Sequence, residues 1–196
     1  ANFVTMWTQA AQMYGAEPNV IFELFNEPNG DFTAIQNAFV AATSAIRQSS
    51  NNLVVVQYGY CGSFDFVDDW APLLQPYGNI VYSNHIYRYP PGATMSTSVT
   101  TTSQIDSNLR NSWSYGSVIG KYPMYIGEIG AWTAYGSGET TWFGNCLSVL
   151  NSYGASYTGW EWGQDGTNWQ LSTPTTAPWS PNTNGQVLRN AIAAGG

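Results

Sequence analysis

The feature of this sequence that most constrains its fold is a regular alternation of short apolar runs with helical patterns. The runs cover residues 20–25, 53–57, 80–84, 122–127 and 157–162. After each run comes a segment whose apolar residues recur at spacings of three and four, the pattern of an amphipathic helix. Because no run follows another directly, we expect parallel strands joined by right-handed crossovers. The loops after the runs are the longer ones and are richer in aromatic and acidic residues, which predicts an α/β fold of the (β/α)8 TIM-barrel type.

The first run ends in a motif that places an acid at a strand end. Residues 20–25 are apolar except for Glu23, which is typical of a strand covered on both faces. Pro28 has no N–H to donate to a sheet and biases the residue before it towards extended geometry. We therefore expect Glu27 to be extended at the carboxyl end of a buried strand. Glu23, four residues earlier on the same face, is interpreted as a buried acid inside the barrel that needs a partner.

Helix boundaries follow from capping residues and from the helical spacing. Residues 3–14 form a helical stripe that Gly15 ends, and Asp31 or Thr33 should cap a helix that runs to about residue 50. Further helices are expected at residues 64–73, before residue 120, at residues 139–153 and before residue 193. Residues 90–103 are rich in Ser and Thr and are long for a connection within a domain, which indicates a binding loop.

Length and charge narrow the class of protein. The 196 residues contain no linker and no repeat, so residues 1–196 are interpreted as a single domain. A net charge of −7 argues against nucleic acid and against an anionic membrane as partners. No apolar run approaches the ~18 residues of a membrane helix, and residues 1–14 do not resemble a signal peptide. Nine Trp and thirteen Tyr indicate a neutral polyhydroxylated ligand, because aromatic rings stack on the C–H faces of sugars.

Two acids, Glu27 and Glu128, end apolar runs and are the candidate catalytic residues. Glycoside hydrolysis needs such a pair, since one carboxyl protonates the leaving oxygen while the other attacks or activates water. Neighbouring groups must hold the two pKa values apart, so that one carboxyl stays protonated while the other is ionised.

The strand-end motifs resemble glycoside hydrolase family 5, which contains cellulases, mannanases and related β-glycanases. The resemblance rests on four motifs in order: Asn26-Glu27-Pro28, His85-Ile86-Tyr87, Gly127-Glu128 and Trp160. It extends from about Phe3 to Trp162 and matches the barrel from its third helix to its C-terminus.

The resemblance implies a retaining endo-β-1,4-glucanase, secreted, that acts through a glycosyl-enzyme ester and needs no metal or cofactor. Glu27 matches the general acid/base and Glu128 the nucleophile. The other matching residues are Asn26, which holds the 2-hydroxyl, His85 and Tyr87, which line the subsite of the cleaved sugar, and Trp160, which forms the platform under that sugar.

Other residues are assigned by their place in the chain. Trp132 and Trp169, in loops after strands, are expected at the rim of the cleft. Glu161 alternates with tryptophans on either side, so we expect it to face away from them and treat it as a weaker catalytic candidate. Cys61 lies in a loop and Cys146 in a helix, and we do not expect them to pair.

The resemblance covers five of the eight strands of a barrel, and the family's first three strands have no match here. The first and last strands would then be open edges. An upstream segment, another chain or a second copy would cover the open side, so a homo-oligomer is one of three hypotheses. The main expectation is hydrolysis of a β-1,4-linked polysaccharide such as cellulose. A β-mannanase, or a half-barrel that binds carbohydrate without catalysis, remains an alternative.

Overall fold

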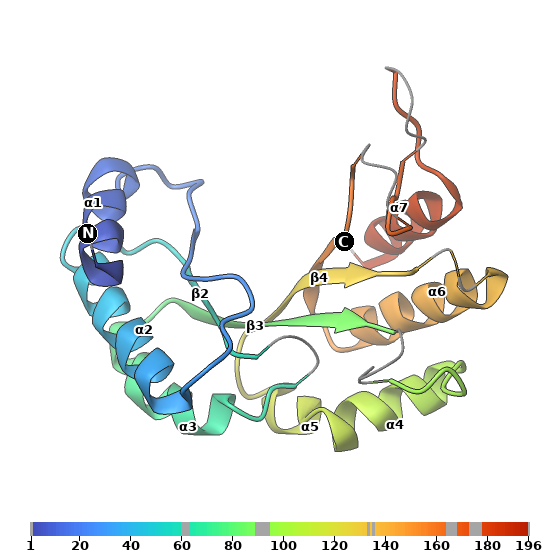
Figure 1. The fold of residues 1–196 in the computed structure, drawn as a ribbon, viewed down its shortest axis with the longest axis horizontal. Coiled ribbons are helices and arrows are strands. Elements are labelled where there is room, and N and C mark those ends of the chain that lie inside the picture. The colour runs from blue at the N-terminus through green and yellow to red at the C-terminus, as the bar shows by residue number, and fades with distance from the viewer. Residues whose placement is uncertain are drawn as a thin grey trace.

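The chain forms a curled parallel sheet, seen in a computed structural model that describes residues 2–59, 63–88, 95–132, 134, 136–163, 168–172 and 178–195. Within these residues five strands lie in the order β1-β2-β3-β4-β5, and all neighbours are parallel. They are β1 (Phe22–Glu23), β2 (Val54–Gln57), β3 (Ile80–Tyr87), β4 (Met124–Gly130) and β5 (Ser156–Gly159). Figure 1 shows the sheet bent into part of a barrel wall, which confirms the predicted partial (β/α)8 barrel with five parallel strands.

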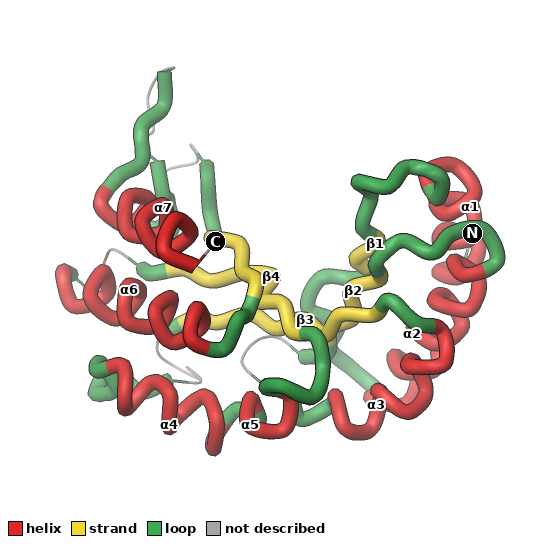
Figure 2. Tube along the Cα trace, turned by 180° about the vertical axis from the view of Figure 1, so that it is seen from behind, coloured by secondary structure: helices red, strands yellow, loops and turns green. Residues whose placement is uncertain are grey.

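The helices line the convex side of the sheet and leave the concave side open, as the two opposite views show (Figures 1 and 2). The N-terminus lies beside α1 and the C-terminus beside α7, on opposite arms of the arc. The helices are α1 (Phe3–Tyr14), α2 (Phe32–Arg47), α3 (Val67–Leu74), the 3-10 turn η1 (Gln75–Tyr77), α4 (Thr102–Ser112), α5 (Tyr115–Val118), α6 (Ser137–Ser152) and α7 (Thr183–Gly195).

Local capping chemistry explains where these helices begin and end. The Asp31 side chain, rather than that of Thr33, caps α2 by accepting from the Ala34 N–H at 2.7 Å. The expected helix before residue 120 is divided into α4 and α5, because Ser114 has a φ of 59° and interrupts the helical hydrogen bonds. The expected binding loop at residues 90–103 lies partly outside the described residues, and its last residues form the start of α4.

The hydrophobic core lies between the convex face of the sheet and the helices. Its largest fully buried side chains include Trp70, Trp142, Tyr82 and Tyr115, each at most 1% exposed. These aromatic residues therefore stabilise the fold and do not line a sugar subsite. Cys146, in α6, is buried with a free thiol, and Cys61 lies outside the described residues.

The first strand differs from the prediction of a strand buried on both faces. It has only two residues in the ladder, and although Phe22 and Leu24 are buried, Ile21 is 58% and Phe25 55% exposed. Glu23 is also exposed, so the prediction of a buried acid was wrong. Phe25 lies past the strand, in a hollow beside α1 and α2 that Phe3 and Phe39 also line. Ile21 and Glu23 face the concave side, where no opposite wall of described residues covers them. They border an open hollow of about 360 Å³ that is lined by Ile21, Glu23, Leu53, Val55, Val81, Met124, Tyr125 and Ser156.

Among the described residues, none of the helices combines the length and the apolar character needed to cross a membrane.

Candidate active site

The carboxyl ends of β1, β3 and β4 bring the predicted acids together at one rim of the sheet. Glu27 follows β1, His85 and Tyr87 end β3, and Glu128 lies near the end of β4. The register between β3 and β4 shifts after Asn84 and sets His85 opposite Glu128. Such irregularities re-aim side chains at strand ends, and here the shift places the imidazole between the two carboxyl groups.

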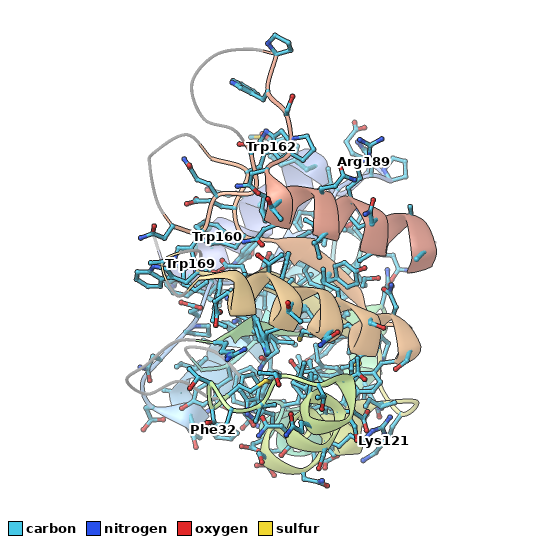
Figure 3. The ribbon with its side chains drawn as sticks, turned by 90° about the vertical axis from the view of Figure 1, so that its right-hand side faces the viewer. Phe32, Lys121, Trp160, Trp162, Trp169 and Arg189 are labelled. Carbon is cyan, nitrogen blue, oxygen red and sulfur yellow. The ribbon has the colours of Figure 1, made fainter. Side chains whose placement is uncertain are left out.

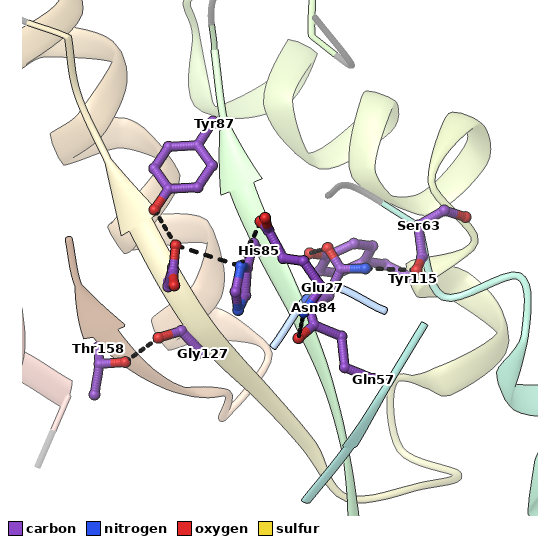
Figure 4. Close-up of polar contacts among 10 residues, drawn as sticks. Glu27, Gln57, Ser63, Asn84, His85, Tyr87, Tyr115, Gly127 and Thr158 are labelled. Carbon is purple, nitrogen blue, oxygen red and sulfur yellow. Dashed lines mark hydrogen bonds and ion pairs between the residues drawn. The ribbon is translucent and has the colours of Figure 1, made fainter. Parts of the chain in front are cut away.

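A single imidazole nitrogen joins the two carboxyl groups. The Nδ1 atom of His85 lies 2.9 Å from Oε1 of Glu27 and 3.4 Å from Oε2 of Glu128, as Figure 4 shows for His85 and Glu27. One oxygen or nitrogen atom from each of the three residues lies within 4.8 Å of the others. A metal ion would fit these distances, but Nδ1 is already shared by the carboxyl oxygens, so we interpret the group as a hydrogen-bond network.

Burial sets the charge of the imidazole. His85 is 1% exposed, and this desolvation lowers its pKa to about 4. The ring is therefore neutral at neutral pH, and its one proton is assigned to Nδ1 because that atom faces two acceptor oxygens.

The two carboxyl groups differ in what surrounds them. Burial, and then the charge of Glu128, raises the pKa of Glu27 to about 7. Burial also raises the pKa of Glu128, and the charge of Glu161 adds to that effect. The Tyr87 hydroxyl donates a short hydrogen bond to Oε2 of Glu128 and opposes the rise, since it favours the ionised form.

Glu27 has a backbone conformation that the sequence did not predict. Its φ is +47°, in the left-handed region, so the expectation of extended geometry was wrong. The Glu27 N–H donates to Oε1 of Gln57 at 3.2 Å (Figure 4). Gln57 is a site residue that was missed, and the signal for it is a polar residue at the end of an apolar run.

Aromatic side chains extend the site on the β4 and β5 side. The ring centroids of Trp169 and Tyr87 are 4.8 Å apart, and those of Trp169 and Trp132 are 5.0 Å apart. A Cβ atom at Gly130 would lie 2.6 Å from the Trp160 carbonyl oxygen and 3.0 Å from the Trp169 ring. The absence of a side chain at Gly130 therefore lets β4 approach these tryptophans closely.

Two predicted residues are not joined to the carboxyl pair. Asn26 is exposed beside Glu27, and the Trp160 side chain is 41% exposed. Among the described residues, no polar contact links either side chain to the pair. In Figure 3, Trp160 and Trp169 lie near one end of α6, and Trp162 lies higher, beside α7.

Comparison with known proteins identifies the family. The family model described as Cellulase (glycosyl hydrolase family 5) matches residues 1–166. The chain belongs to glycosyl hydrolase family 5. Endoglucanase N of Pectobacterium atrosepticum is 27% identical over 97% of this chain. The family 5 chain spans 40% of the length of that relative and about two thirds or less of the solved structures that it matches.

Solved structures support the same fold for this family 5 chain. An endo-beta-1,4-glucanase from Xanthomonas axonopodis pv. citri superposes with a TM-score of 0.76 at 18% identity, over 98% of this chain and 65% of the other. Cel5A of Thermotoga maritima, solved in complex with a mannotriose substrate, gives a TM-score of 0.70 at 16% identity, over 97% and 65% of the two chains.

Proposed function

We propose that this chain carries the catalytic pair of a retaining endo-β-1,4-glucanase, with Glu27 as the general acid/base and Glu128 as the nucleophile. The observation that carries the proposal is the closeness of the pair, whose atoms facing His85 lie within 4.8 Å of each other. Retaining pairs are separated by ~5–5.5 Å, whereas inverting pairs leave room for a water at roughly 6.5–9.5 Å.

In the first step, a Glu128 carboxylate oxygen attacks the anomeric carbon, and the bond to the leaving oxygen breaks. Glu27 gives its proton to that oxygen, and a glycosyl ester forms on Glu128. In the second step, Glu27 takes a proton from water, whose oxygen attacks the same carbon and releases Glu128. Both residues end in their starting states, so the cycle needs no metal or cofactor.

The surroundings of the two acids support this division of roles. A pKa of about 7 keeps Glu27 protonated in mildly acidic solution, as a general acid requires. Glu128 accepts the Tyr87 hydroxyl, which favours the charged form that a nucleophile requires.

The substrate that we propose is a β-1,4-linked glucan, and the enzyme would act outside the cell. The curated relative is an endoglucanase, and Trp132, Trp160 and Trp169 offer ring faces for sugars beside the pair. The mannotriose complex of the Thermotoga enzyme favours a second candidate, a β-mannanase, which the same catalytic pair would serve.

The test measures reducing-sugar release from carboxymethyl-cellulose and from mannan. We expect faster cleavage of cellulose and a loss of about 10³-fold or more in Glu128→Gln, because no other group can form the ester. Glu17→Gln is the matched control, since Glu17 is an exposed acid away from the site. A 2-deoxy-2-fluoro-cellobioside with a good leaving group should add the mass of one fluorocellobiosyl group, a disaccharide, to wild type and none to Glu128→Gln.

Unchanged activity in Glu128→Gln would refute the assignment. Binding of cellulose by wild type with no turnover and no mass adduct would instead support a carbohydrate-binding half-barrel.

We also propose that the open concave face is covered in the working enzyme, by further barrel strands or by a second copy. The exposure of Ile21, which borders the largely apolar hollow on that face, supports this. Light scattering that shows a monomer, without binding of a hydrophobic dye, would contradict it.

A further inference from the structure

Hydrogen bonds between the β1 segment and the β2 segment continue beyond the regular ladder of the two strands. Backbone hydrogen bonds run from the Phe22 N–H to the Leu53 carbonyl at 2.9 Å and from the Leu24 N–H to the Val55 carbonyl at 3.1 Å. The next link is different, because the Glu27 N–H donates to the Gln57 side chain at 3.2 Å. The Gln57 amide therefore replaces a backbone carbonyl and holds Glu27 out of the strand line.

The segment after Glu27 is held by the residues that follow Gln57. The Gly59 N–H donates to the Pro28 carbonyl at 3.0 Å, and the Tyr58 hydroxyl donates to the Gly30 carbonyl at 3.0 Å. A left-handed φ such as the +47° of Glu27 is strained for a residue with a side chain and persists only where neighbouring contacts impose it. Residues 57–59 supply those contacts.

The Gln57 side chain is poorly suited to stability alone. It is 1% exposed, and its Nε2 atom is buried with no hydrogen-bond partner in the part of the chain that the structure describes. A buried donor without an acceptor destabilises the folded state. An apolar side chain of the same length would avoid this cost, so the amide is best explained by the one bond that its oxygen makes.

We propose that Gln57 is a positioning residue for catalysis, which holds Glu27 through its backbone N–H in the strained conformation that aims the carboxyl group at His85 and at the leaving oxygen. This inference rests on the proposed role of Glu27 as the general acid. Gln57 itself exchanges no proton and touches no reacting atom.

The proposal predicts a dependence on the leaving group. A sugar alcohol leaves only if it is protonated, whereas an activated phenol such as 2,4-dinitrophenol leaves without help from an acid. Misplacing the acid should therefore slow cleavage of the first kind of substrate and spare the second. General acid catalysis contributes roughly 10²–10⁴-fold, and a small displacement forfeits part of that.

The experiment compares kcat/KM for a cello-oligosaccharide and for 2,4-dinitrophenyl cellobioside. In Gln57→Met we expect kcat/KM to fall about 10–100-fold on the oligosaccharide and much less on the aryl glycoside, with an unchanged or higher Tm. Gln57→Glu keeps an acceptor oxygen and should retain more of the oligosaccharide activity.

A matched control is available in Gln104. Its Oε1 also accepts backbone N–H groups, from Thr100 and Thr101 at 3.1 Å, at the exposed start of α4. Gln104→Met should lower Tm slightly and leave the ratio of the two substrates unchanged. The two variants thus separate positioning of Glu27 from a general effect of losing a glutamine.

A second measurement requires no turnover. His85 is the one histidine of the chain, so its imidazole ¹⁵N signals need no assignment. Since His85 Nδ1 lies 2.9 Å from Glu27, displacement of Glu27 should shift these signals in Gln57→Met, as it should in Glu27→Gln, but not in Gln104→Met.

The outcomes are distinct. Equal losses on both substrates together with a lower Tm, or imidazole signals like those of wild type, would overturn the role of Gln57. If Glu27→Gln itself shows no dependence on the leaving group, the proposed function fails instead. If kcat/KM depends on the leaving group in Glu27→Gln but not in Gln57→Met, only the proposed role of Gln57 is refuted.

Discussion

Removing the Tyr87 hydroxyl should shift the pH dependence of the proposed reaction. The hydroxyl donates to Oε2 of Glu128, which is 17% exposed, so the bond to the ionised carboxylate is poorly screened by solvent. Hydrogen bonds to charged groups contribute about 1.5–3 kcal/mol. At 1.36 kcal/mol per pKa unit, Tyr87→Phe should raise the pKa of Glu128 by about 1–2 units.

The other groups that face Glu128 remain in this variant. Burial and the charge of Glu161 continue to raise the pKa of Glu128, and His85 Nδ1 stays 3.4 Å away. Phe keeps the ring that packs at 4.8 Å against Trp169. The variant therefore isolates the hydroxyl.

The assay is a pH profile of kcat/KM on a soluble β-1,4-glucan oligosaccharide. The acidic limb should move to higher pH by about 1–2 units, so activity falls about 10–100-fold on the acid side and less near neutrality. The apparent pKa values read from the acidic and basic limbs describe the coupled pair of Glu27 and Glu128, not either residue alone.

Tyr153→Phe is the matched control. The Tyr153 hydroxyl also donates to a carboxylate, Oδ1 of Asp106 at 2.6 Å, but in the helical layer outside the site. It should leave the profile unchanged. An acidic limb that does not move in Tyr87→Phe, or that moves equally in both variants, would refute the reasoning.

Three further predictions concern stability and packing. Burial raises the pKa of Glu27 from its ordinary value of 4.5 to about 7 in the folded protein. The free energy of unfolding should therefore fall as the pH rises from about 4.5 to 7. Above pH 7, urea titration should show Glu27→Gln more stable than wild type by about 2 kcal/mol in the free energy of unfolding, after allowance for solvent screening, and near pH 4 the two should be equally stable. An equal gain in stability at both pH values would contradict this. Arg88→Met should lower the free energy of unfolding, measured with urea, by about 3 kcal/mol, because it leaves the 3% exposed Glu139 without the guanidinium 3.5 Å away. This loss of stability should be smaller when Glu139 is also replaced by an apolar residue. Gly130→Ala should lower both Tm and kcat/KM, because a Cβ would lie 2.6 Å from a carbonyl oxygen and 3.0 Å from an indole ring; unchanged values would show that β4 can shift.

The parts of the fold that follow local rules could be predicted from the sequence. Helix α1 has the predicted bounds because its stripe and its end at Gly15 are local features. Glu27 and Glu128 meet because parallel strands end at one rim, which the alternation of strands and helices already implies.

Other features depend on contacts between distant residues. The bias of Pro28 towards an extended Glu27 is overridden by hydrogen bonds from residues 57–59, thirty positions away. The exposure of Ile21 depends on whether another part of the protein covers the concave face, and the apolar run at residues 20–25 carries no information on that. The proposed role of Gln57 likewise depends on a contact between two strand ends that are thirty residues apart in the sequence.

The curl of the sheet has a consequence for engineering this scaffold. The packing that stabilises the fold lies in the convex layer, where Trp70 and Trp142 are fully buried, while the proposed catalytic residues lie at the rim around His85. A mutagenesis library restricted to concave positions would therefore vary reactivity with little risk of unfolding. Randomising the convex layer would mostly yield chains that fail to fold, even if the residues at the rim are unchanged.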